Sequence, residues 1–217
     1  MSPVSKLAVP EALLVFGLVM AYIWKLRAIY PGFWLLPLAL IVASHWLRHE
    51  RPSTLIFRTK NFGACARRFG PVLIAIVAAM WGAGLLAGSI RPLGFWGALP
   101  SFAAYLPWGW FQQYLLNGYF LKRFDMALSR NAAAILTSAL FCVAHIPNWF
   151  LMLVTPITSL AAIWVYRRYR NLYFLALAHA MIGFTLFMVV PDTVSHHLRV
   201  GPGWYTWRII PPALPSE

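Results

Sequence analysis

The chain has few charged residues and very few acidic ones. Charged residues occupy 11% of its 217 positions, and only five of them are Asp or Glu. Hydrophobic residues occupy 61%, which is more than a soluble domain carries. The apolar residues form long runs separated by basic connections, as in a polytopic membrane protein. We therefore expect an all-α membrane helix bundle that forms a single domain over residues 1–217.

The rare acidic residues all lie at the ends of apolar runs or in connections, so no carboxylate is expected in the middle of the membrane. The net charge of +13 could suit a nucleic-acid-binding protein. However, the basic residues lie between apolar runs, where the positive-inside rule and anionic headgroups explain them. The expected partner is therefore the lipid bilayer and not a nucleic acid. The five acidic residues are Glu11, Glu50, Asp125, Asp192 and Glu217.

Cysteine is also scarce. Cys65 lies in a basic loop and Cys142 in an apolar run, so we expect both to be unpaired, and neither has the surroundings of an activated thiol. The first apolar run follows a single lysine, Lys6, and has no small-residue cleavage site after it. We therefore interpret this run as a retained span and not as a signal peptide.

Seven apolar runs predict about seven transmembrane spans. Pro100 and Pro107 are expected to kink or break the fourth span, and Pro147 to end the fifth. The predicted spans are Leu7–Trp24, Gly32–Leu47, Pro71–Ser89, Phe95–Phe120, Asn131–Ile146, Trp149–Tyr166 and Asn171–Val190.

The basic residues divide unequally between alternate connections of this map, with thirteen on one side and five on the other. This asymmetry predicts a cytoplasmic N-terminus, and we expect the membrane to be the inner membrane of a bacterium. Lys25 and Arg27, directly after the first span, are the main exception. The five bases on the predicted external side are Lys25, Arg27, Arg91, Arg199 and Arg208.

Two segments outside the spans combine bases or aromatics with apolar residues. The stretch Pro52–Gly70 is basic with interspersed apolar side chains, which favours a segment lying on the anionic leaflet. The C-terminal tail, residues 191–217, holds Trp204, Tyr205 and Trp207 among Pro and Gly. These are typical interface aromatics, so we expect no further span there.

Strongly polar side chains are few within the predicted spans. Gln113 and Asn117 lie four residues apart and therefore share a helix face, while Gln112 lies about 100° around the helix. Carboxamides in hydrocarbon need partners, because an unpaired one costs several kcal/mol. His145 and His179, on the fifth and seventh spans, are the expected partners. Ionisable residues at membrane depth are candidates for function.

The order of these residues resembles the CPBP family of intramembrane proteins, which includes CAAX prenyl proteases and bacteriocin-processing proteins and is also called Abi. The pattern of that family is Glu-Glu-x-x-x-Arg, then Phe-x-x-x-His, then a late His-x-x-x-Asn. The matching runs here, within a predicted core of residues 93–190, are Gln112-Gln113-x-x-x-Asn117, Phe141-x-x-x-His145 and His179-x-x-x-Gly183.

The resemblance implies a water activated by a glutamate of the pair and by the first histidine, with an oxyanion stabilised by the late histidine and asparagine. It also implies membrane-anchored, lipidated peptides as substrates. The catalytic positions that it implies here are Gln112, Gln113, Asn117, His145, His179 and Gly183.

Three of these positions depart from the pattern. Glutamine can orient a water but cannot take its proton. Gly183 has no side chain that could donate to an oxyanion. Asn117 replaces the arginine that would pair with a carboxylate, so a charged pair has been exchanged as a unit for neutral amides.

No cofactor is expected. A zinc site needs three Cys, His or carboxylate ligands, and the matching helices supply only His145 and His179. His45 could complete a triad if the second span packs against the centre. A divalent metal at His145 and His179 is thus the alternative to a metal-free centre.

Three functions fit this sequence. The first is a non-catalytic CPBP-like protein that acts as a scaffold, an assembly factor or a subunit of a membrane complex. The second is an intramembrane endopeptidase in which His145 is the base. The third is a transporter or channel, which the lack of intramembrane carboxylates and of internal repeats disfavours.

Overall fold

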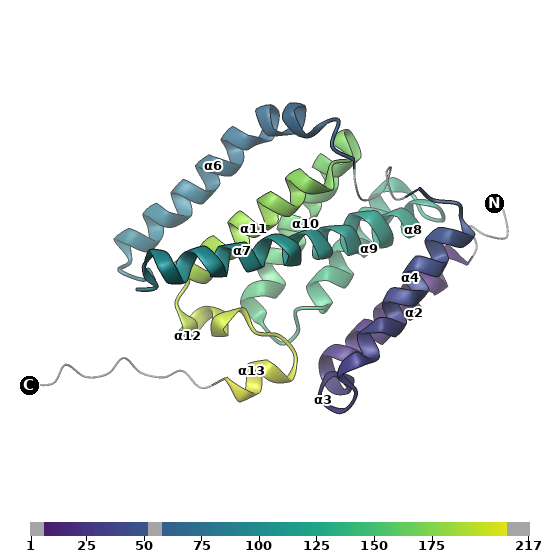
Figure 1. The fold of residues 1–217 in the computed structure, drawn as a ribbon, viewed down its shortest axis with the longest axis horizontal. Helices are drawn as coiled ribbons and strands as arrows, with labels where there is room; N and C mark the ends of the chain where they lie inside the picture. The colour runs from purple at the N-terminus through teal and green to yellow at the C-terminus, as the bar shows by residue number, and fades with distance from the viewer. Residues whose placement is uncertain (1–6, 52–57, 208–217) are drawn as a thin grey trace, which may run out of the picture.

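The computed structural model describes residues 7–51 and 58–207, and within them the chain forms only helices and the turns between them (Figure 1). This confirms the all-α prediction. The longer helices are α2 (Ala8–Ala21), α4 (Leu35–Leu47), α6 (Phe62–Leu86), α7 (Gly94–Gln113), α9 (Arg130–Val143), α10 (Trp149–Tyr169) and α11 (Leu172–Val189). The shorter elements are η1 (Tyr22–Leu26), α3 (Arg27–Ile29), η2 (Pro31–Trp34), η3 (Tyr114–Phe120), α8 (Leu121–Asp125), α12 (Asp192–Ser195), η4 (His196–Leu198) and α13 (Pro202–Thr206).

Four helices are long and apolar enough to cross a membrane, and two shorter helices, Pro31–Leu47 and Arg130–Val143, are also apolar. Large apolar side chains on the surface, such as Leu86 at 93% and Trp46 at 76% exposure, need a lipid environment. The expected membrane helix bundle is therefore confirmed, while the seven spans and the cytoplasmic N-terminus stay predictions. The four helices are Ala8–Ile29, Phe62–Leu86, Trp149–Tyr169 and Leu172–Val189.

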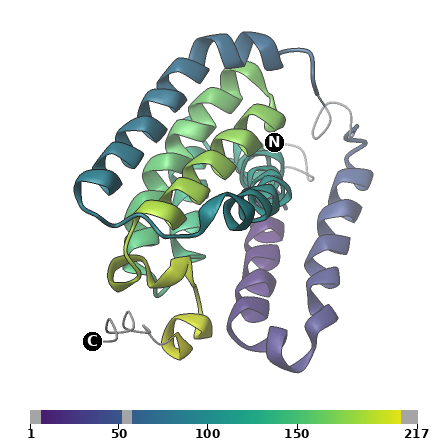
Figure 2. The ribbon, with the colours of Figure 1, turned by 60° about the vertical axis from the view of Figure 1, so that its left-hand side comes forward.

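The N-terminal helices form a unit of their own. Helices α2 and α4 run side by side, apart from the group formed by α6, α10 and α11, in both views (Figures 1 and 2). Helix α7 packs along α11, and α6 covers α11 from the other side. The N-terminal pair meets the rest of the bundle where α2 contacts α8.

Helix α7 continues through both of the prolines that were expected to kink or break it. Pro100 and Pro107 both lie inside it, so neither breaks the helix. Directly after Gln113 the backbone changes to the π-helical segment η3 and then returns to the α-helical α8. Helices α7, η3 and α8 thus follow one another without a break from Gly94 to Asp125, and the three amide side chains lie within this continuous helical segment.

Two other predicted boundaries need correction. Helix α6 begins at Phe62, so the part of the predicted surface segment from Phe62 to Gly70 is the first stretch of α6, while residues 52–57 lie outside the described residues. Helix α9 ends at Val143, before Pro147. Residues 208–217, and with them Arg208, also lie outside the described part of the chain, as does Lys6.

Small residues allow α7 and α11 to approach closely. A Cβ added at Gly109 would lie 2.9 Å from the carbonyl oxygen of Ala176 and 3.2 Å from Cδ2 of His179. A Cβ at Gly183 would lie 3.1 Å from the ring of Tyr105. Membrane helices use small residues in this way, because backbone proximity increases van der Waals contact. The contact at Gly109 brings α7 directly against His179.

Candidate functional site

Three side chains form a neutral hydrogen-bonded chain between α7 and α11. Asn117 donates from Nδ2 to Oε1 of Gln113 over 2.8 Å, and Nε2 of Gln113 lies 3.2 Å from Nδ1 of His179. An amide nitrogen can only donate, so Nδ1 of His179 accepts and its proton lies on Nε2. We call Gln113, Asn117 and His179 the amide centre. Asn117 is fully buried and Gln113 is 5% exposed.

The backbone around the amide centre departs from regular α-helical geometry. Asn117 lies in the π-helical η3, which follows Gln113 directly. Single π-helical turns are rare and occur often at functional sites. One acceptor in this region has no partner among the described residues, namely Oδ1 of Asn117. Oδ1 of Asn117 is therefore an unused hydrogen-bond acceptor among the described residues.

Gln112 and His145 have no described hydrogen bond to these three residues and line a cavity of about 1020 Å³. The cavity lies between the N-terminal helices, α7, α9 and the segment after α12, and most of its wall is apolar. The predicted polar residues thus divide into two groups. Gln113, Asn117 and His179 contact one another, whereas Gln112 and His145 face the cavity.

His145 has a defined tautomer. Its Nδ1 donates to the carbonyl oxygen of Phe141 over 2.6 Å, so in the neutral ring Nε2 carries the lone pair. The ring also packs edge-on against Phe141, with centroids 4.8 Å apart. His145 therefore has an acceptor nitrogen suited to hydrogen-bond a water or a substrate in the cavity.

The position of the family's late asparagine is closed. Gly183 packs against the ring of Tyr105, which leaves little space for a larger side chain there. No oxyanion donor can come from Gly183 itself. Among the described residues, no group of three or more His, Cys, Asp or Glu side chains could hold a metal ion.

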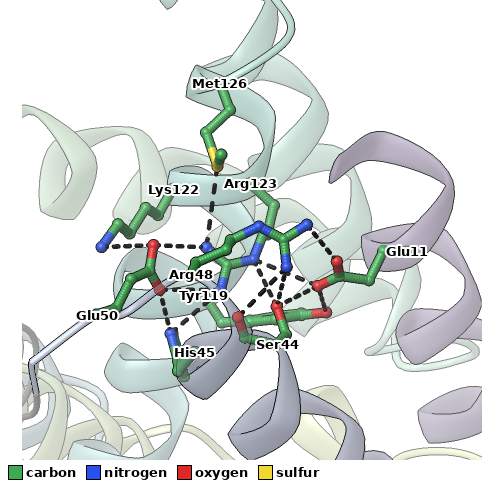
Figure 3. Close-up of polar contacts among 9 residues, drawn as sticks. All are labelled: Glu11, Ser44, His45, Arg48, Glu50, Tyr119, Lys122, Arg123 and Met126. Atoms are coloured by element: carbon green, nitrogen blue, oxygen red, sulfur yellow. Dashed lines mark hydrogen bonds and ion pairs between the residues drawn. The ribbon is translucent and has the colours of Figure 1, made fainter. Parts of the chain in front are cut away.

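A second polar site, which the sequence did not predict, surrounds Arg123 where α2, α4 and α8 meet (Figure 3). Its guanidinium is 0% exposed and makes two hydrogen bonds to Glu50, Nη1–Oε1 at 3.0 Å and Nη2–Oε2 at 2.9 Å. The side chain of Arg123 is therefore buried and ion-paired within the bundle and does not lie exposed at its surface. We call this site the charged cluster; it comprises Glu11, Ser44, His45, Arg48, Glu50, Tyr119, Lys122 and Arg123.

The carboxylate of Glu11 is bound by the other basic and hydroxyl side chains of the charged cluster. Nη2 of Arg48 lies 2.5 Å from Glu11, and Nε of Arg123 lies 3.3 Å from it. Glu11 also accepts a hydrogen bond from the Tyr119 hydroxyl over 3.0 Å and one from Ser44. Because Glu11 lies on α2 and Arg123 on α8, these contacts join helices far apart in the sequence.

Glu50 stays ionised in this setting. Burial by itself would raise its pKa, but hydrogen bonds from His45, Arg123 and Lys122 outweigh burial and hold the pKa well below its usual range. A bidentate pair with a buried arginine stabilises the carboxylate form. The charged cluster therefore keeps its ion pairs throughout the neutral pH range.

The signal that could have found the charged cluster was present but ambiguous. Glu11 stands five residues into the first apolar run, and Glu50 and Arg123 follow apolar runs. Charges at such places normally face headgroups or water. Only the packing of α2 and α4 against α8 shows that they meet one another.

The helices and the apolar surface define an integral membrane protein of the helical-bundle class. Residues 94–185 match the family described as type II CAAX prenyl endopeptidase Rce1-like. This match supports the resemblance to the CPBP family over residues 94–185. It covers α7 to most of α11, which includes the amide centre and His145. Comparison with curated proteins gave no match, and neither did comparison with solved structures.

Proposed function

We propose that this chain is a non-catalytic CPBP-type membrane protein that acts as a scaffold, an assembly factor or a subunit of a membrane complex. One observation carries the proposal: both polar ends of Gln113 are engaged, Oε1 by Asn117 and Nε2 by His179. A residue whose amide joins two helices in this way is a structural tie. We propose the bacterial cytoplasmic membrane as its location.

The chemistry of the cavity supports the same conclusion. The side chains that line it include amide, hydroxyl, imidazole and basic groups, but no carboxylate among the described residues. A carboxamide has no basic oxygen at neutral pH, so Gln112 can hold a water without activating it. The carboxylates of Glu11 and Glu50 are bound within the charged cluster.

A second candidate function rests on His145. Its Nδ1 hydrogen bond to Phe141 leaves Nε2 as an acceptor, and the residue lines a cavity large enough for a peptide segment. In this alternative, His145 would take a proton from water, and Gln112 would orient that water. The substrates would be membrane-anchored or lipidated peptides, as the family's name suggests.

A cleavage assay separates the two functions. The purified chain and its His145→Ala variant are placed in proteoliposomes with a farnesylated peptide that ends in a CAAX sequence, and release of the last three residues is followed by mass spectrometry. We expect equal, background release from both proteins. An active CAAX endopeptidase in parallel liposomes shows that the substrate is accessible.

The opposite result is equally clear. Release by the wild type that exceeds background and disappears in His145→Ala would overturn the non-catalytic function and establish His145 as the base. The two proteins must elute as the same monodisperse species for the comparison to hold. Release that persists in His145→Ala but disappears when Gln113 is changed to Ala would also overturn the proposal.

A further inference from the structure

Three basic side chains stand together at the exposed end of the cavity. Lys25 in η1, Arg27 in α3 and Arg199 after η4 all line it, and all three are exposed. We call them the basic rim. Trp24 and Trp34 line the same end and are 37% and 46% exposed, as aromatics at a membrane interface are.

The segment after α12 is held against η1, which fixes the basic rim. A Cβ added at Gly201 would lie 2.9 Å from Cγ2 of Ile23, so the two backbones are in close contact. The amide nitrogen of Gly201 donates to the carbonyl of Ile146 over 2.9 Å. Figures 1 and 2 both show α13 at the same end of the molecule as α3.

Asn148 anchors the Arg199 side of the basic rim. It is fully buried, and its Nδ2 donates to the carbonyl of Ser195 over 2.8 Å and to that of Arg199 over 3.0 Å. Its Oδ1 accepts from the amide of Leu151 over 3.1 Å, which caps α10. The backbone at Arg199 is therefore tied to the start of a long helix, only three residues beyond His145.

No carboxylate of residues 7–51 or 58–207 forms an ion pair with the basic rim. Arg199 stacks over the ring of Trp207 at 4.7 Å, and neither Lys25 nor Arg27 has an ion pair within the described residues. Every described carboxylate is engaged elsewhere. These pairs are Glu11 with Arg48 and Arg123, Glu50 with Lys122 and Arg123, Asp125 with Arg167, and Asp192 with Arg91.

We propose that the cavity binds an anionic phospholipid, with its phosphate on the basic rim and its acyl chains along the apolar wall. Three bases that have no carboxylate partner in the described part of the chain attract an anion, and a large apolar cavity favours a ligand with a hydrocarbon part. The site also accounts for Lys25 and Arg27, which run against the positive-inside asymmetry. It is independent of whether His145 performs chemistry.

Lipid binding by the detergent-purified chain tests this site. Native mass spectrometry measures the retention of dioleoyl phosphatidylglycerol and of dioleoyl phosphatidylcholine, which share their acyl chains and differ in headgroup charge. We expect the wild type to retain the phosphatidylglycerol at least about tenfold better. Removal of the basic rim in Lys25→Gln/Arg27→Gln/Arg199→Gln should weaken phosphatidylglycerol binding by roughly fivefold for each base.

A matched control removes the same charge elsewhere. Lys60, Arg67 and Arg68 are exposed and do not line the cavity, so the variant Lys60→Gln/Arg67→Gln/Arg68→Gln should keep the wild-type preference. Equal retention of the two lipids by the wild type, or an equal loss in both triple variants, would overturn the site. Displacement of the phospholipid by sn-glycerol 3-phosphate at the same concentration would overturn the role of the acyl chains.

Discussion

The amide centre and the charged cluster differ in how their polar side chains are stabilised within the bundle. Both place strongly polar side chains inside an apolar helix bundle. The amide centre contains no formal charge and joins α7 to α11 through the hydrogen bond between Gln113 and His179, while Asn117 binds the other end of the Gln113 amide. The charged cluster contains carboxylates and basic side chains and joins α2 and α4 to α8. Its arginine is as fully buried as Asn117.

The difference shows what each site can tolerate. Neutral amides in a membrane interior need only mutual hydrogen bonds, each worth about 1 kcal/mol or less. A buried charge needs a partner of opposite charge, and removing one partner leaves the other uncompensated. Within residues 94–185, α7 is therefore tied to α11 by a neutral hydrogen bond, whereas ion pairs join α8 to the N-terminal helices.

Removal of the central arginine should have the largest effect. We expect Arg123→Ala to lower the free energy of unfolding by about 3–5 kcal/mol, because it leaves the partly buried carboxylates of Glu11 and Glu50 with fewer cations. Thermal unfolding in detergent, followed by circular dichroism, measures the change. Arg168→Ala, which truncates an exposed arginine, is the control. Equal stability of the two variants would show that the charged cluster holds nothing together.

Two neighbouring glutamines offer a sharper contrast. Gln113→Ala removes both ties of the amide centre and should cost about 1–3 kcal/mol, because it leaves Asn117 and His179 without those partners. Gln112→Ala changes only the cavity wall and should stay within about 0.5 kcal/mol of the wild type. Denaturant unfolding in mixed micelles compares the two. A cost for Gln112→Ala that matched the cost for Gln113→Ala would contradict the division of the polar residues described above.

Acid should weaken the charged cluster in a recognisable pH range. The pKa of Glu50 is lower in the folded protein than the usual value of 4.5, so its contribution is complete above about pH 4.5 and is lost as the pH falls toward its folded pKa. Unfolding measured between pH 7 and pH 3 should therefore show stability falling below about pH 4.5. Glu50→Gln should be less stable at pH 7 and should lose less stability per pH unit. The same slope for both proteins would rule out this role of Glu50.

Much of the helical scaffold could be predicted from the sequence, because long apolar runs and prolines limit the choices. The predicted seventh span, Asn171–Val190, differs from α11 by one residue at each end. The spacing of Gln113 and Asn117 also predicted that they share a face, and His179 was an expected partner. These inferences needed only helical periodicity and the cost of unpaired amides.

The remaining features depend on tertiary contacts. No local pattern distinguishes a headgroup-facing Arg123 from one that meets Glu11 and Glu50, since Glu11 and Arg123 lie on separate helices and Glu50 follows a third. The close contact of Gly183 with Tyr105 also arises from packing between helices. His145 was expected beside the amides, yet its described hydrogen bond is to Phe141 in its own turn.

The coupling free energy between Gln113 and His179 tests the amide centre most directly. A double-mutant cycle compares the unfolding free energies of the wild type, Gln113→Ala, His179→Ala and the double variant in the same lipid mixture. Hydrogen bonds between membrane helices contribute about 0.6 kcal/mol on average and up to about 1.7, so we predict a coupling in that range. Strictly additive costs would contradict the claim that these two residues tie α7 to α11.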